Sequence, residues 1–182
     1  PQDIAILVRS NRQAEEYRQA LAEAHIPAVV GSRLSVYKTD ECRDLLLLLQ
    51  AIAAPGDLVR MKTSMTIPWF NLTGNALQEI WKDDEQVSEY HARFIGYSQL
   101  WQEQGTMAMM SRLLVEERVF VNLASRQMAE RSIANIQHLL ELIQEQESAT
   151  SLGVGQVLQW LLSMRKESGK GDEAELLLES DE

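Results

Sequence analysis

The stretch IAILVRSNRQAEEYRQALAEAHIPAVV, residues 4–30, decides the fold expected at the start of the chain. Its apolar, β-branched beginning predicts a buried strand over residues 3–8. Ser10 or Asn11 can cap a following helix, which ends near a proline because proline disfavours helical geometry in the residue before it. A short apolar run at 28–30 predicts a second strand. We therefore expect a βαβ unit with parallel strands and a right-handed crossover.

Arg9 directly follows the first predicted strand. Ligands of open α/β sheets bind beyond the carboxyl ends of the strands, and arginine offers a planar fork to phosphate oxygens. The residues alone leave a second interpretation open, in which Arg9 forms a surface ion pair with Glu15 or Glu16.

The rest of the chain is predicted to be mainly helical. Thr39 is expected to cap a leucine-rich helix that has Asp40 and Glu41 in its first turn and ends at Pro55-Gly56. Apolar spacing and capping residues predict further helices over 57–65, 73–81, 87–105, 107–114, 128–143 and 154–164, with an ordered loop at 67–73. A polar loop at 166–175 and the start of a strand at 176–178 complete the expected fold, which is α/β followed by mainly α.

Composition restricts the function. The 182 residues are 45% hydrophobic and carry a net charge of −10, which predicts a globular chain and argues against a freestanding nucleic-acid binder. A piece of a larger DNA-handling protein stays compatible with this charge. Cys42 is the sole cysteine, which fits a reducing compartment, and we expect a cytoplasmic location. No apolar run is long enough to span a bilayer, so no membrane partner is expected.

Motifs for independent catalysis are not apparent. The glycines at 168–172 have no hydroxyl residue after the lysine and no clear strand before them, which favours a linker over a phosphate loop. The three histidines are widely separated, and we expect no metal site. Arg126 and Arg131 could touch a phosphate, although a solvated helix face is the favoured interpretation. The missing initiator Met and the ending Ser-Asp-Glu suggest an excised fragment.

Residues 3–30 resemble motif IV of the UvrD-like superfamily 1 helicases, in which a strand, Arg-(Ser/Thr)-Asn, a helix and Ile-Pro follow in this order. Residues 31–57 resemble the segment that follows this motif. The stretch GYSQLWQEQ to LLELIQE, residues 96–145, is similar to the RecB-type helicase–nuclease branch, the beta subunits of exodeoxyribonuclease V.

The resemblance implies a domain plan. Residues 1–56 would form part of the second RecA-like motor domain, 57–172 a helical insertion domain, and 173–182 the return toward the motor domain. The Walker motifs and any nuclease domain would lie outside the chain. No catalytic site would be complete here, and the fragment alone is expected to be inactive.

The resemblance also implies residue roles. Arg9 would reach the terminal phosphate of ATP across the cleft between the motor domains, and Asn11 matches its partner in the motif. Arg33 and Lys38 are the candidate DNA contacts. ATP with Mg²⁺ would serve the full-length protein, and the fragment is not expected to hold it tightly. The implied partners are DNA and the gamma and alpha chains of the exodeoxyribonuclease V complex.

The function implied is that of one subunit of an ATP-dependent helicase–nuclease that unwinds and degrades duplex DNA ends in recombinational double-strand break repair. Two alternatives stay open at this point. One is a nuclease-free UvrD-like helicase or an AddA-like protein, and the other is an independent helical protein-interaction module.

Overall fold

The computed structural model describes residues 36–126, 128–150 and 152–179, together with ten positions between Ile6 and Ile26; beyond residue 166 it describes the backbone only. The chain divides into two compact units, Pro1–Leu34 and Ser35–Glu182. Each unit is described by itself.

The described positions of the first unit are partly helical. Gln13, Tyr17 and Leu21 are in helical conformation, and the amide of Ile26 donates to the carbonyl of Leu21 at 2.8 Å. These positions fit the helix predicted after Ser10. Ile6 and Val8 have no strand assignment, and the other residues of the strands predicted at 3–8 and 28–30 lie outside the described residues. A strand is defined by its hydrogen-bonded neighbour, and no such ladder occurs among the described residues, so the βαβ part of the predicted fold is not confirmed.

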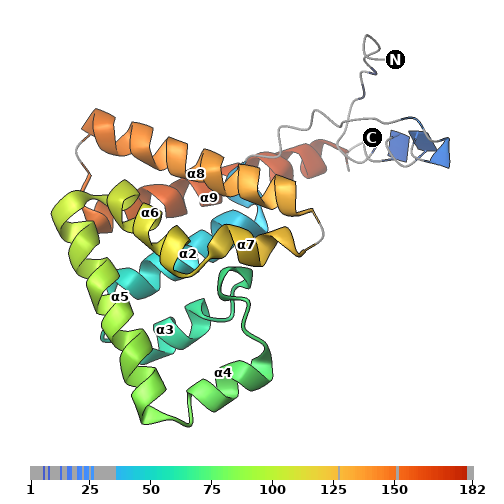
Figure 1. The fold of residues 1–182 in the computed structure, drawn as a ribbon. Coiled ribbons are helices and arrows are strands. Elements are labelled where there is room, and N and C mark those ends of the chain that lie inside the picture. Colours follow the sequence, from blue (N-terminus) through green and yellow to red (C-terminus); the bar gives the residue numbers. More distant parts are fainter. Residues whose placement is uncertain are drawn as a thin grey trace. The chain divides into compact units, whose positions relative to one another are not determined.

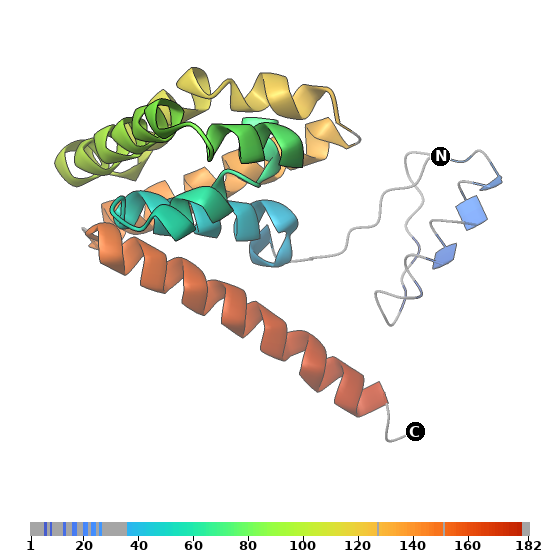
Figure 2. The ribbon, with the colours of Figure 1, turned by 90° about the horizontal axis from the view of Figure 1, so that it is seen from below.

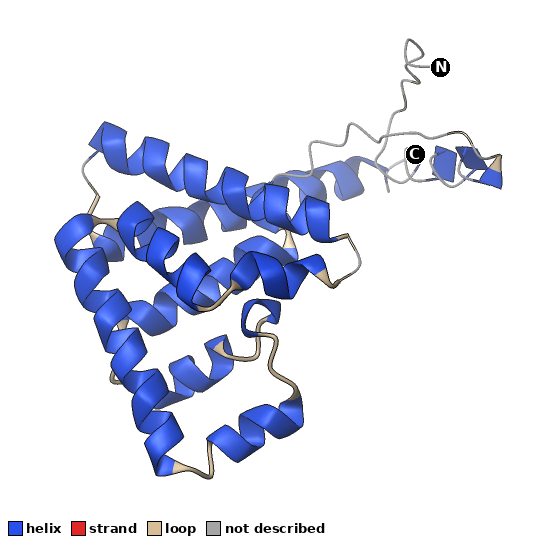
Figure 3. Cartoon of the chain, in the orientation of Figure 1, coloured by secondary structure: helices blue, strands red, loops and turns tan. Residues whose placement is uncertain are grey.

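The second unit is built from helices (Figure 1, Figure 3). Its elements are, in order, η1 (Val36–Lys38), α2 (Asp40–Ala53), α3 (Leu58–Ser64), η2 (Pro68–Phe70), α4 (Gly74–Ile80), α5 (Asp84–Gln104), α6 (Thr106–Glu116), α7 (Val119–Ala124), α8 (Ala129–Thr150) and α9 (Val154–Glu179). The mainly helical character predicted for this part of the chain is confirmed.

Helix α2 forms the centre of the unit. Leu45, Leu48, Leu49 and Ile52 are fully buried, and α2 packs against α3, α5, α8 and α9. Its leucines cover more than one face, which explains why helices surround it. The boundary between the two compact units lies before α2, whereas the predicted motor portion extends to residue 56; the predicted domain plan stays a prediction.

The helix starts follow their capping residues. Thr39 accepts a hydrogen bond from the amide of Cys42, and Thr73 accepts one from the amide of Ala76. Both predicted caps are confirmed. Asp57 and Asp83 do the same for α3 and α5, each accepting from two amides in the first turn.

Helices α5 and α6 meet at Gly105. Its φ is 86°, a backbone conformation that glycine adopts without steric cost. The aromatic face predicted for α5 packs inward: Phe94, Tyr97 and Trp101 are buried. The ring of Phe94 stacks on Phe70 of η2 at 6.3 Å between centroids. The periodicity of this helix therefore predicted its buried face correctly.

Four details differ from the expectation. Helix α7 was not predicted, and the loop predicted at 67–73 contains η2. The polar loop at 166–175 and the strand at 176–178 are wrong, because α9 continues to Glu179 as one helix (Figure 2). The two glycines of this stretch cost roughly 1 kcal/mol each, and the Lys, Glu, Ala and Leu residues around them favour helix. No proline interrupts the stretch.

Candidate functional site

The predicted site residues are only partly placed by the structure. Arg9 and Arg33 lie outside the described residues. Lys38 ends η1 and is half-buried, directly before the residue that caps α2. The structure therefore brings one predicted DNA contact to the start of α2 and leaves the predicted ATP contact untested.

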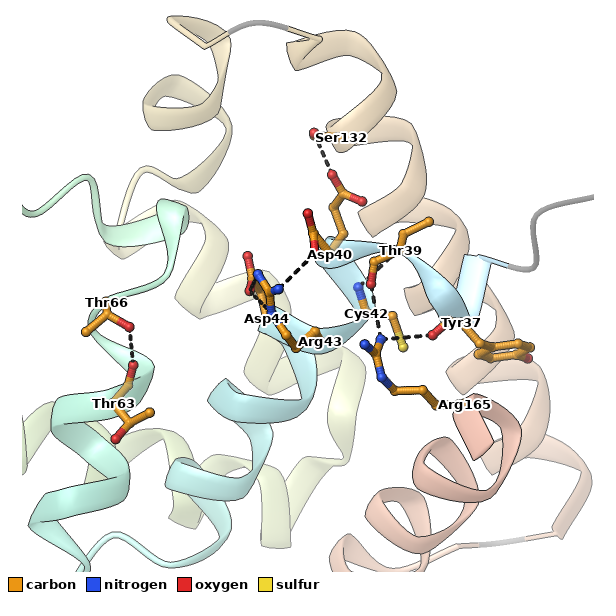
Figure 4. Close-up of polar contacts among 11 residues, drawn as sticks. Tyr37, Thr39, Asp40, Cys42, Arg43, Asp44, Thr63, Thr66, Ser132 and Arg165 are labelled. Atoms are coloured by element: carbon orange, nitrogen blue, oxygen red, sulfur yellow. Dashed lines mark hydrogen bonds and ion pairs between the residues drawn. The ribbon is translucent and has the colours of Figure 1, made fainter. Parts of the chain in front are cut away.

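Figure 4 shows polar contacts that meet at the start of α2. Thr39 Oγ1 donates to the carbonyl of Val36 at 2.7 Å and accepts from the amide of Cys42 at 3.3 Å. Asp40 follows in the first turn, where the positive end of the helix dipole favours acids. This local geometry fixes where the chain enters the helical unit.

Glu41 joins α2 to α8. Its carboxylate accepts a hydrogen bond from Ser132 Oγ at 2.6 Å and another from Asn135 Nδ2 at 3.0 Å. Burial is the largest single effect on Glu41 and would raise its pKa, but the hydrogen bonds to its carboxylate, led by those from Ser132 and Asn135, together outweigh burial, and the pKa lies below its ordinary value. The carboxylate therefore stays ionised at neutral pH.

Arg165 joins α9 to the same region. Its Nη1 donates to the carbonyls of Tyr37 at 3.0 Å and Thr39 at 3.1 Å. The ring of Tyr37 meets Trp160 edge to face, with 6.0 Å between the centroids. A single guanidinium on α9 thus holds the segment through which the chain enters α2.

Cys42 lies within this region but is not reactive. Its side chain is fully buried, and burial raises the pKa of the thiol above its ordinary value even though Arg165 opposes the shift. The thiolate, which is the nucleophilic form, is therefore disfavoured.

A second polar cluster joins α5 to the end of α6. Arg93 Nη1 lies 2.9 and 3.1 Å from the two carboxylate oxygens of Glu117. The Tyr97 hydroxyl lies 2.9 Å from oxygens of both Glu116 and Glu117 and donates its proton between them. Burial, followed by the nearby charge of Glu117, raises the pKa of Tyr97 far above its ordinary value. Arg112 pairs with Glu116 at 2.7 Å, so this cluster neutralises its own charges.

These clusters connect helices of the second unit. Within the described residues, no group of three His, Cys, Asp or Glu side chains is placed to hold a metal ion. The hollow found on α8 is lined by Glu141, Gln144, Glu145, Ser148 and Ala149, which include no cation that could hold a phosphate. None of the described helices has the length and apolar character needed to cross a bilayer.

Comparison with known proteins identifies the family. The model of the UvrD-like helicase C-terminal domain matches residues 1–167. The chain belongs to this family. The match includes the first compact unit and residues 35–167 of the second, and it confirms the relationship that motif IV and the later helical stretch indicate.

The related proteins are much longer than this chain, which matches only a part of each. The chain is 31% identical to RecBCD enzyme subunit RecB of Escherichia coli K12 over 79% of its length, and 27% identical to RecB of Mycobacterium tuberculosis H37Rv over 98%. It is 25% identical to the A subunit of the ATP-dependent helicase/nuclease of Ruminiclostridium cellulolyticum over 98% of its length. The matched regions amount to 12%, 16% and 16% of these proteins.

Sequence reasoning did not find the contacts at the start of α2. Glu41 was noticed only as an acid in a first helical turn, and its partners on α8 lie 91 and 94 positions away. The role of Arg165 could not be predicted from the sequence, because no local pattern shows that this side chain binds carbonyls more than 120 positions away.

Proposed function

We propose that this chain is a segment of a RecB-like protein, one subunit of an ATP-dependent DNA helicase–nuclease. The whole protein would unwind and degrade duplex DNA ends in recombinational double-strand break repair. The family match over residues 1–167, together with relatives named as RecB and as part of an ATP-dependent helicase/nuclease, is the observation that supports this proposal.

Arg9 is the proposed ATP contact. Charge spreads over the transferred phosphoryl oxygens during hydrolysis, and a guanidinium held beside them stabilises that charge. ATP with Mg²⁺ would be bound by the full-length protein, with Arg9 supplying one wall of the site. The segment itself is proposed to be inactive, because the opposite wall belongs to another motor domain.

DNA and the gamma and alpha chains of an exodeoxyribonuclease V complex are the proposed partners, and the cytoplasm is the proposed location. Arg33 and Lys38 are the proposed DNA contacts. Lys38 lies in η1, where Arg165 also holds the backbone at Tyr37, so this cation is presented from an anchored segment.

The experiment uses the full-length protein that contains this segment. Arg9→Ala should lower DNA-dependent ATP turnover by about a thousandfold, the order of magnitude that arginine contacts supply in phosphoryl transfer. Binding of duplex DNA without nucleotide should stay near the wild-type value. Arg18→Ala, which changes another arginine of the same stretch without a proposed role, is the control. ATP turnover that is equal in the two variants would reject the role of Arg9.

The match to the helicase/nuclease of Ruminiclostridium cellulolyticum favours an AddA-like protein as the second candidate. A plain UvrD-like helicase differs from both in having no nuclease. Release of acid-soluble nucleotides from linear duplex DNA, measured with the full-length protein and ATP, separates the nuclease-containing candidates from the nuclease-free one.

A further inference from the structure

Three arginines lie close together in the sequence where α6, α7 and α8 follow one another. Arg118 directly precedes α7, Arg126 follows it, and Arg131 lies in the first turn of α8; all three are exposed. We call residues 118–131 the arginine corner. Figure 1 shows α7 beside the start of α8, and the two helices pack on each other.

The arginine corner differs from the rest of the described helical unit in its pairing. Elsewhere the arginines are held: carboxylates pair with Arg43, Arg60, Arg93 and Arg112, and carbonyls bind Arg165. The guanidinium groups of Arg118, Arg126 and Arg131 make no hydrogen bond or ion pair with any residue that the structure describes. The corner also has a single acid, Glu130, in a chain whose net charge is −10.

Apolar side chains are exposed in the same short stretch. Val121 is 70% exposed and Met128 is 65% exposed. Met128 also has a φ of 61°, a left-handed conformation that costs a residue with a side chain roughly 1–2 kcal/mol. The exposed side chain of Met128 contributes little packing within the unit that could offset this cost.

We propose that the arginine corner docks an acidic protein surface of a partner subunit, with Val121 and Met128 entering an apolar hollow of that partner. This inference rests on the proposed function, which places the protein in a multi-subunit complex. Carboxylates of the partner would pair with the three guanidinium groups, and its apolar hollow would remove Val121 and Met128 from water.

The composition of the corner favours protein over nucleic acid. Arginine and methionine are enriched at protein interfaces while lysine is depleted, and residues 118–131 contain no lysine.

The test uses the full-length protein and the partner subunits encoded with it. The corner variants are the double charge reversal Arg126→Glu/Arg131→Glu, and Val121→Ser. The matched controls are Lys166→Glu, which reverses an exposed cation outside the corner, and Val59→Ser, which truncates a valine that is 76% exposed on α3. Surface plasmon resonance gives the Kd for the partner subunits, and circular dichroism melting confirms folding.

The double reversal should weaken partner binding by about tenfold or more, and Val121→Ser should weaken it by several-fold, while both controls stay at the wild-type Kd. DNA-dependent ATP turnover of the uncomplexed subunit should be unchanged in every variant. If the double reversal lowers the Tm, the comparison of partner Kd between Val121→Ser and Val59→Ser decides the question by itself.

Three results would overturn the docking surface. The corner variants could bind the partners as tightly as the controls do. They could instead lose affinity for a blunt duplex oligonucleotide while keeping the partners, which would make the corner a DNA contact. The wild-type protein could hydrolyse ATP with DNA yet bind no partner subunit. A wild-type protein without any DNA-dependent ATP turnover would reject the proposed function itself.

Discussion

The carboxylate of Glu41 joins α2 to α8 through two side-chain hydrogen bonds. Ser132 and Asn135 donate to it, and they keep its pKa below the ordinary value despite burial. A carboxylate with a depressed pKa in the folded state stabilises the protein above its unfolded pKa, and this contribution disappears as the pH falls through the folded pKa.

We therefore expect the Tm of the wild type to fall as the pH drops below about 4, near and under the unfolded pKa of glutamate. Glu41→Gln should have a lower Tm at neutral pH and a shallower acid dependence. Differential scanning calorimetry between neutral and acid pH measures both. Glu89→Gln, at an exposed position on α5, serves as the control. Parallel acid profiles for wild type and Glu41→Gln would contradict the role of this carboxylate.

Arg165 acts at the same scale, through two backbone carbonyls of the segment that enters α2. Arg165→Met keeps an unbranched apolar stem and removes both hydrogen bonds. We expect the free energy of unfolding in urea to fall by about 1–3 kcal/mol, because a half-buried carbonyl that loses its donor keeps its desolvation cost. Lys166→Met is the neighbouring control, since Lys166 is exposed and makes no such bonds.

Hydrogen exchange separates this explanation from a general loss of packing. In Arg165→Met, amides over residues 36–40 should exchange faster, while those in the middle of α5 should change only with global stability. Uniformly faster exchange across the helical unit would count against a local anchor.

At the scale of elements, substituting Gly96 within α5 and substituting Gly105 at its end should have opposite effects on stability. Gly96 lies inside the helix with no atom within 4 Å of an added Cβ, and Gly105 ends the helix with a φ of 86°. Gly96→Ala should raise the free energy of unfolding by roughly 0.5–1 kcal/mol because it restricts the unfolded chain and favours helix.

Gly105→Ala should lower the free energy of unfolding by roughly 1 kcal/mol or more, since the left-handed backbone that joins α5 to α6 is strained for alanine. Each glycine serves as the control for the other, and thermal melting of both variants measures the difference. Stabilisation by alanine at both positions would show that the α5–α6 corner adopts another backbone conformation.

Elements also differ in how well local sequence predicts them. Thr39 and Thr73 predicted the starts of α2 and α4 because a cap and its first turn are local chemistry. The end of α9 was missed because Gly169 and Gly171 suggest a loop, whereas helix persists there. Helix α7 was missed because six residues are too few for an apolar period to show.

At the scale of the whole molecule, ATP hydrolysis is proposed to be a property of two motor domains together. Under this proposal, the chain by itself would supply only Arg9, on one side of such a site. We expect the purified chain to release no phosphate from ATP above a buffer blank, with or without duplex DNA. Turnover that persists through further purification would mean that the chain contains a complete nucleotide site, which contradicts the proposed architecture.

The sequence by itself determined the family through motif IV and the 96–145 stretch, and it determined the helical character and the capped starts of α2 and α4. These are local properties of spacing, capping and propensity. Only the tertiary structure decided that Glu41 meets α8, that Arg165 holds η1, and that Arg118, Arg126 and Arg131 stay unpaired among the described residues. The reason is physical: such contacts join positions up to 128 residues apart, and packing of the intervening helices, rather than any local pattern, sets which side chains can meet.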